Sequence, residues 1–237
     1  MNLRFGGNSQ IGTTRKSNQD SLFIGQNKTM CFSVVCDGVG GLENGEIASV
    51  ETVFNLREWF INVAPQMMNF EEAYISLYNR VMETNNQILS KYNQNTVKTG
   101  TTVSAVLIYD NRFFIIHIGD SRIYKYAFDL TQITVDHTEN SVRMIKGKES
   151  VKTVLSQCVG IKKEPNIYCA EGYVYRHEAF LLCTDGFYKR MEVHEIKKAI
   201  KKITRFTNID KVCNKLALDV INRKEKDNLS IGIIKMC

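Results

Sequence analysis

Two blocks of short strand-forming runs, each accompanied by a pair of helical stretches, constrain the fold of this chain more than any other feature. Apolar and β-branched runs begin near Ser21, recur between Thr101 and Thr134, and return from Ile167. Elements grouped in this way indicate an α+β fold with layered antiparallel sheets. A doubly wound parallel sheet would need strict alternation of strands and helices, and is excluded. The helices are expected over 47–61, 70–92, 193–203 and 209–222.

The two helices of the first pair are predicted from the spacing of their apolar residues. In the second of them, Asn69 is the expected N-cap. Its expected buried stripe is Ala73, Leu77, Val81 and Ile88. In the first helix the recurring apolar residues are Ile47, Val50, Val53/Phe54 and Phe60/Ile61. The segment from about His137 to Ile167 is the least regular, and we expect it to be a surface excursion.

Length and composition indicate one globular domain, residues 1–237. A chain of 237 residues buries roughly 70% of its unfolded surface, enough for one sizeable core. Apolar residues make up 43% and charged residues 24%, which excludes disordered and fibrous classes. The net charge of +6 is uneven: residues 142–205 carry 14 basic and 7 acidic residues, or +7, and the remainder is balanced.

Cysteine usage and the N-terminal sequence predict a reduced, cytoplasmic protein with no membrane association. The seven cysteines are an odd number without a Cys-x-x-Cys pair, and only four histidines are present, so a zinc site is not expected. The first residues lack the apolar stretch of a signal peptide. No segment has the roughly 18 apolar residues that span a bilayer.

Aspartates at the ends of apolar strands are the strongest functional signal. A single Asp-Gly pair after a strand is explained by the turn alone. Several in one domain favour a shared purpose, because clustered carboxylates must be protonated or neutralised. All-oxygen ligands indicate Mg²⁺ or Mn²⁺, and a dinuclear metal hydrolase is the resulting hypothesis. The aspartates are Asp20, Asp37, Asp120, Asp185 and Asp227.

Read in order, the motifs around these aspartates resemble the metal-dependent serine/threonine protein phosphatases of type 2C, in their compact bacterial form. They span nearly the whole chain, and together they are far more specific than any one alone. The motifs are RKSNQD (15–20), VVCDGVGGLENGEIAS (34–49), TGTT (99–102), HIGDSRIY (117–124), ITVDHT (133–138), LLCTDGFYKRM (181–191) and KDNLSIGII (226–234).

The resemblance implies a four-layer α-β-β-α sandwich, with a flap at about 138–168 near the active site. It implies two Mn²⁺ or Mg²⁺ ions and a possible third. Arg15, Asp37 and Asp185 would be catalytic, with Arg15 clamping the substrate phosphate. Asp37 would bridge two ions, and the Gly38 carbonyl would be a further ligand. Asp185 and Asp227 would complete the shell of one ion. Asp20 would hold metal-bound water, and Asp120 with Asp185 would form a third metal site.

Two departures from the family pattern concern Gln19 and Val39. Some members have a glutamate where this chain has Gln19, so the second ion is expected to bind more weakly. Animal members have a histidine, proposed as general acid, where this chain has Val39, so water must protonate the leaving group. No cysteine begins a Cys-x₅-Arg loop, which excludes a phosphocysteine route.

The expected partners are phosphorylated proteins, with a serine/threonine kinase as functional counterpart and the phosphatase itself a monomer. Flap lysines and arginines are hypothesised to dock acidic phosphoproteins. The lysines at 197–202 are interpreted as a solvated helix face rather than a nucleic-acid site. His117 is equally consistent with a core or a catalytic role, and a structural role is favoured for His137. The rival function is a non-catalytic phosphoprotein-binding module, and a phosphoesterase acting on small molecules is a further alternative.

Overall fold

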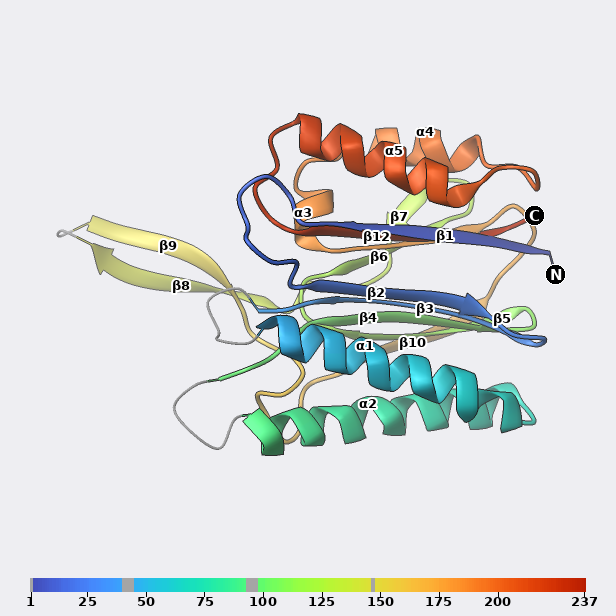
Figure 1. Ribbon diagram of the computed structural model, residues 1–237, viewed down its shortest axis with the longest axis horizontal. Coiled ribbons are helices and arrows are strands. Elements are labelled where there is room, and N and C mark those ends of the chain that lie inside the picture. Colours follow the sequence, from blue (N-terminus) through green and yellow to red (C-terminus); the bar gives the residue numbers. More distant parts are fainter. Residues whose placement is uncertain (1, 40–44, 93–97, 146–147) are drawn as a thin grey trace.

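The computed structural model describes residues 2–39, 45–92, 98–145 and 148–237, and contains two five-stranded antiparallel sheets with helices on their outer faces (Figure 1). The predicted α+β class with antiparallel sheets is confirmed. The first sheet has the order β1–β12–β11–β6–β7. Its strands are β1 (Leu3–Gln10), β12 (Leu229–Met236), β11 (Ala179–Cys183), β6 (Arg122–Tyr126) and β7 (Leu130–Gln132).

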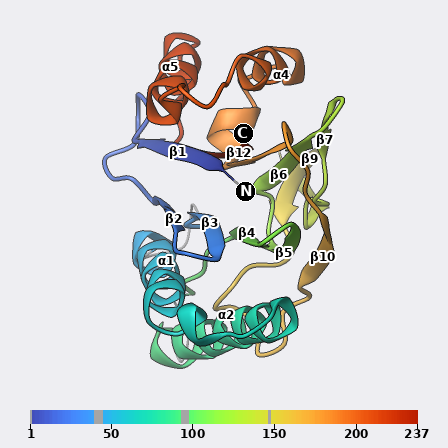
Figure 2. The same ribbon diagram turned by 90° about the vertical axis from the view of Figure 1, so that its right-hand side faces the viewer.

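The second sheet has the order β10–β5–β4–β3–β2 and faces the first (Figure 2). Between the sheets lies an apolar layer that includes Val35, Ile115, Phe180 and Ile234, all fully buried. These side chains alternate with residues that face the helices, as the two-residue period of a strand requires. The strands are β10 (Tyr168–Tyr173), β5 (Arg112–Ile118), β4 (Val103–Tyr109), β3 (Met30–Asp37) and β2 (Asp20–Gln26).

One helix pair covers each sheet (Figure 2). Helices α1 (Gly45–Asn62) and α2 (Phe70–Tyr92) share a core with the second sheet, and α4 (Val193–Lys201) and α5 (Ile209–Asn222) share one with the first. A short 3₁₀ turn (Ala64–Gln66) links α1 to α2, and α3 (Asp185–Tyr188) precedes α4. In the described part of the chain, no helix is long and apolar enough to cross a membrane.

The predicted details of α2 are confirmed, and α1 is a helix as predicted, but most of the apolar residues whose spacing predicted α1 are exposed. Asn69 accepts a hydrogen bond from the Glu72 N–H at 2.9 Å, and the four residues of the expected α2 stripe are buried. In α1, Val53 and Phe60 are buried but the other recurring residues are 41–55% exposed. The helix instead turns Ala48, Leu56 and Trp59 inward, because Trp59 packs edge-on against Phe32 of β3. The exposed residues are Ile47, Val50, Phe54 and Ile61.

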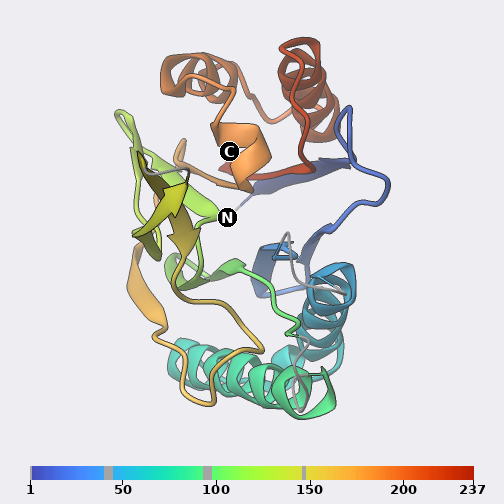
Figure 3. The ribbon, with the colours of Figure 1, turned by 90° about the vertical axis from the view of Figure 1, so that its left-hand side faces the viewer.

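Strand β1 and a hairpin of two further strands were not predicted. In β1 the sequence LRFGGNSQ has no apolar alternation, yet it pairs along its whole length with β12. The segment expected to be irregular contains β8 (Thr138–Ile145) and β9 (Lys148–Leu155), which pair only with each other and project from the sandwich (Figures 1 and 3). Residues 146 and 147 of the expected flap lie outside the described residues.

Candidate active site

The aspartates singled out in the sequence all lie at the end of the sandwich from which the hairpin projects. Asp37 closes β3, and Asp20, which opens β2, is its direct neighbour in the ladder. Asp120 follows β5, and the positive φ of +116° at Gly119 permits the sharp turn into it. Asp185 starts α3 directly after β11, and Asp227 precedes β12. Four separate strands and one helix therefore place these carboxyl groups.

A pocket of about 470 Å³ collects most of the predicted site residues. Asp20 does not line it: this residue is buried, and Thr184 donates a hydrogen bond to its Oδ2 at 2.7 Å. Gln19 and Val39, the two departures from the family pattern, do line the pocket, and so does strand β9 from Lys152 to Leu155. The predicted site residues in the pocket are Arg15, Asp37, Gly38, Asp120, Asp185 and Asp227.

Burial and mutual repulsion destabilise the ionised form of these carboxyl groups. Burial raises the pKa of Asp37 well above its usual range, and Asp20 and Asp185 add repulsion. Burial likewise raises the pKa of Asp20 to about 7 and that of Asp120 to about 6. Cations brought into the pocket therefore relieve an existing electrostatic cost.

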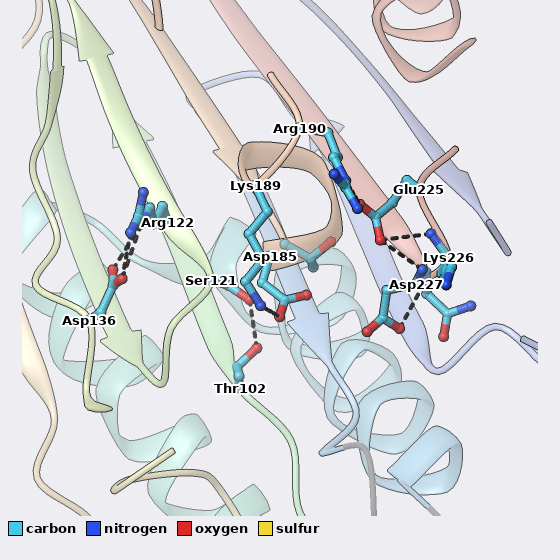
Figure 4. Close-up of polar contacts among 12 residues, drawn as sticks. Thr102, Ser121, Arg122, Asp136, Asp185, Lys189, Arg190, Glu225, Lys226 and Asp227 are labelled. Atoms are coloured by element: carbon cyan, nitrogen blue, oxygen red, sulfur yellow. Dashed lines mark hydrogen bonds and ion pairs between the residues drawn. The ribbon is translucent and has the colours of Figure 1, made fainter. Parts of the chain in front are cut away.

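Two side-chain cations already neutralise part of the cluster. Arg15 binds Asp227 through Nε and one terminal nitrogen, at 2.8 and 2.9 Å from the two carboxylate oxygens. Lys189 Nζ lies 2.5 Å from Asp185 Oδ2, and Figure 4 shows it reaching down from α3 toward that carboxylate. The hydrogen bond to Asp227 is the main reason that the pKa of Arg15 is raised.

The carboxylates fit hard divalent cations in chemistry, but they are not assembled around one. Among the residues that the structure describes, no three His, Cys, Asp or Glu side chains converge closely enough to hold a metal ion. The donors that face the pocket are oxygens, the type that Mg²⁺ and Mn²⁺ prefer. Beneath them, Asp20 Oδ1 is buried without a hydrogen-bond partner. An ion bound here therefore competes with Arg15 and Lys189 for the negative charge of Asp227 and Asp185.

Thr101 and Thr102, which directly precede strand β4, hold the backbone of Asp37. The backbone N–H of Asp37 donates to Thr102 Oγ1 at 2.8 Å, and Thr101 donates to the Asp37 carbonyl at 2.8 Å. Thr102 is in turn bonded to the Ser121 hydroxyl at 2.8 Å, beside Asp120 (Figure 4). The TGTT motif thereby links the backbone of Asp37 to Ser121, the neighbour of Asp120, a connection that the sequence analysis missed.

Glu225 positions Asp227 in a similar way. Its Oε1 accepts the backbone N–H of Asp227 at 2.9 Å, and its Oε2 pairs with Arg190 at 2.7 Å (Figure 4). Nothing in the sequence pattern singled out Glu225 or Arg190. Lys189 was also missed, although its spacing of four residues from Asp185 was a usable signal for two side chains on one helix face.

Both histidines of interest have structural partners. His117 is fully buried, with its ring nitrogens 2.9 Å from the Ser104 hydroxyl and 3.0 Å from the Val135 carbonyl. Burial lowers its pKa to about 4, so it remains neutral. His137 Nδ1 accepts the Gly119 N–H at 3.2 Å, and this contact ties the base of the hairpin to the turn before Asp120.

Carboxylate oxygens that suit hard cations, beside an arginine that suits phosphate, are the groups that metal-assisted phosphoryl hydrolysis uses. A family model described as protein phosphatase 2C matches residues 7–218. The chain therefore belongs to the protein phosphatase 2C family, the metal-dependent serine/threonine protein phosphatases that its motifs resemble.

Bacterial proteins are among the relatives. A putative protein phosphatase of Mycoplasma pneumoniae is 24% identical, over 96% of this chain and 94% of that protein. The serine/threonine phosphatase stp of Listeria innocua is 25% identical, with 80% of each chain covered. The solved structure of the S. agalactiae serine/threonine phosphatase superposes with a TM-score of 0.84 at 20% identity, over 99% of this chain and 100% of that one. The last match shows a shared fold.

Proposed function

We propose that this pocket hydrolyses phosphoserine and phosphothreonine in proteins by direct attack of water on phosphorus, with no covalent enzyme intermediate. The observation that carries the proposal is the convergence of Arg15 with four aspartates in one pocket. The ligands of two Mn²⁺ or Mg²⁺ ions would be Asp37, the Gly38 carbonyl, Asp185 and Asp227. Asp20 would hold metal-bound water from below, and Asp120 with Asp185 would serve a third ion.

Divalent ions at such a site supply two effects: they lower the pKa of water, and they neutralise charge on the phosphoryl oxygens. The chain's own contribution is positioning. Only glycine fits at position 38, because a Cβ there would lie 2.3 Å from the Gly45 carbonyl oxygen, and this close packing holds the backbone that carries the proposed carbonyl ligand. Thr101 donates to the Asp37 carbonyl and Thr102 accepts from the Asp37 N–H, and these two hydrogen bonds hold the backbone of Asp37 in place while charge changes around it.

Arg15 is suited to bind the substrate phosphate, because it projects from a loop and its side chain is 41% exposed. Its planar fork matches two phosphate oxygens as well as it matches the two oxygens of Asp227. Val39 at the pocket wall has no proton to donate, so water is left to protonate the leaving alkoxide. The neutral side chain of Gln19 would weaken the second ion's hold.

The cysteines do not supply a nucleophile. Cys36, adjacent to Asp37, is fully buried, and its pKa is raised well above the ordinary value by burial. Burial also raises the pKa of Cys158 to about 12. Thiols in such surroundings stay protonated and unreactive at neutral pH, which supports direct attack by water.

The hairpin β8–β9 and the segment after it form the proposed flap, residues 138–168, within one catalytic domain of residues 1–237. Lys152 of β9 lines the pocket, so a basic group stands at its entrance. Lys162 and Lys163 follow the hairpin, whereas the side chains of Arg143, Lys146 and Lys148 lie outside the described residues. We expect the flap to attract acidic phosphoproteins at low ionic strength. Unchanged turnover of a phosphoprotein at low salt, after charge reversal of Lys152, Lys162 and Lys163, would refute this role.

The decisive experiment measures phosphate release from a phosphothreonine peptide with and without Mn²⁺. Asp185→Asn should reduce the rate by about 10² or more, because it removes a charged group at the reacting centre. Asp129→Asn is the matched control, since Asp129 is an exposed residue that pairs with Lys197 on another face. Metal-independent release, or equal rates for wild type and Asp185→Asn, would refute the proposed mechanism, and no release under any condition would favour the non-catalytic binding module. The proposed counterpart is a serine/threonine kinase, and the proposed active form is a monomer.

A further inference from the structure

A groove of about 650 Å³ runs between α4 and α5, on the outer face of the first sheet (Figure 2). Its walls are the facing sides of the two helices, where residues recur at three- and four-residue spacing. The floor is apolar, with Met191 and Leu216 buried and Ala199 and Val212 half-buried. Four lysines stand along the walls: Lys198 and Lys202 on the α4 side, and Lys211 and Lys215 on α5.

These four ammonium groups have no carboxylate partner. In the described part of the chain none of them forms an ion pair, although Lys197, one position away, pairs with Asp129 at 2.9 Å. Two acidic residues line the groove, and one of these, Glu195, is held by Arg223 at 2.6 and 2.8 Å. The second is Asp219, so the four lysines leave the groove with an excess of positive charge above an apolar floor. The sequence pattern had suggested only a solvated lysine face.

We infer that the α4–α5 groove docks an acidic protein segment that carries apolar side chains, at a distance from the phosphorylated residue to be hydrolysed. Carboxylates or phosphates of the segment pair with the lysines, and its apolar side chains cover the floor. Nucleic acid fits less well, because no Phe, Tyr or Trp side chain lines the groove in the described residues to stack on bases. The inference rests on the proposed phosphatase function.

The groove is connected to the active-site pocket by a short chain of polar contacts. Arg223, which holds Glu195 in the groove wall, donates to the Arg190 carbonyl at 2.7 Å. Arg190 pairs with Glu225, which accepts the backbone N–H of Asp227. The C-terminal end of α5 and helix α3 lie at the end of the sandwich that carries the pocket (Figure 1). A segment held in the groove thus lies on the elements that lead into the site, so docking raises the local concentration of its phosphoresidue there.

The test compares an acidic phosphoprotein, phosphorylated β-casein, with the small substrate p-nitrophenyl phosphate, both with Mn²⁺. The groove variant carries Lys198→Glu, Lys211→Glu and Lys215→Glu. Its matched control changes the same charge at exposed positions outside α4 and α5, with Lys28→Glu, Arg57→Glu and Arg176→Glu. We expect the groove variant to raise KM for casein about 10-fold at low salt, an effect that high salt removes. Its kcat for casein and both constants for p-nitrophenyl phosphate should match those of the control.

Equal KM values for casein in the groove variant and the control would overturn the docking inference, while leaving the phosphatase proposal intact. If the wild type with Mn²⁺ hydrolyses neither casein nor p-nitrophenyl phosphate, the phosphatase proposal itself is refuted. A third arm adds a single-stranded oligonucleotide as competitor. If it inhibits casein turnover by the wild type but not by the groove variant, and a glutamate–leucine peptide inhibits neither, then the groove binds nucleic acid and the inference is wrong.

Discussion

Replacing Lys189 by methionine should tighten metal binding, because this lysine occupies a carboxylate that a metal ion would need. Lys189 Nζ is 2.5 Å from Asp185 Oδ2, with 58% of the lysine side chain and 17% of the aspartate side chain exposed. An exposed pair of this kind is worth only about 1 kcal/mol, since water screens the lysine and its side chain loses rotamer freedom. A metal ion must overcome that amount before it binds Asp185. Removing the lysine should therefore lower the Mn²⁺ dissociation constant about 5-fold.

Isothermal titration calorimetry of Mn²⁺ into the protein at neutral pH measures this change directly. Lys201→Met is the matched control, because it removes one positive charge from an exposed helix position. Its dissociation constant should stay close to that of the wild type, which separates the local contact from the change in net charge. Lys189→Arg should also bind Mn²⁺ like the wild type. Affinity that is unchanged or weaker in Lys189→Met would refute the competition between Lys189 and the metal.

Three further predictions follow from other contacts of the site. Arg15→Ala should lower kcat/KM for a phosphothreonine peptide by about 10². Arg15→Lys should be intermediate, because a single ammonium cannot make the two-pronged contact with phosphate. A loss below 3-fold, on the order of 0.6 kcal/mol, would argue against a phosphate-binding role for Arg15. Burial raises the pKa of Asp20 to about 7 and of Asp120 to about 6, so between about pH 4 and 7 the folded metal-free protein holds more protons than the unfolded chain. These groups therefore make the free energy of unfolding fall as the pH rises. In a thermal shift assay, millimolar Mn²⁺ should increase Tm more at about pH 7.5 than at about pH 5.5, because fewer protons then compete for the carboxylates. A larger increase at about pH 5.5 would contradict competition between metal and protons. Gly186→Ala should cost about 3 kcal/mol in urea denaturation, because its Cβ would lie 2.1 Å from the Asn228 carbonyl oxygen; a cost under about 1 kcal/mol would show that the backbone there yields easily.

The parts of the fold that sequence analysis predicted correctly are those in which local pattern and burial agree. Helix α2 has a polar outer face, so its apolar stripe marks the buried side without ambiguity. In α1 apolar residues occur around most of the helix, and the buried side is decided by contact with Phe32 rather than by spacing. Strand β1 has glycines where an apolar pattern would be, because a Cβ at Gly6 would collide with Asp210 of α5. Such a requirement exists only in the tertiary structure.

The same contrast between local pattern and tertiary contact applies to the candidate active site. Each aspartate follows or precedes an apolar run, so its place at a strand end is a local property of the sequence. Whether several strand ends meet at one point depends on sheet order, which periodicity does not give; that the aspartates share one site was implied by the motif resemblance. Contacts between side chains from distant segments, such as Arg190 with Glu225 or Thr102 with Ser121, left no signal of their own. Sequence reasoning thus identified Arg15 and four of the aspartates that line the pocket, but neither Lys189 nor the network that positions these groups.

The pairing of Arg15 with Asp227 has a consequence for the order of binding. Arg15 uses the Nε–H and a terminal N–H, the fork that would bind a phosphate, to hold both oxygens of Asp227. The same guanidinium edge cannot serve a carboxylate and a phosphate at once, and a metal ion on Asp227 weakens the hold of Arg15, because it repels the guanidinium and neutralises the carboxylate. A cation that takes Asp227 from Arg15 therefore releases the arginine for substrate, whereas substrate arriving first must break the ion pair unaided. The contact between Arg15 and Asp227 therefore favours an order in which metal binds before the phosphoprotein.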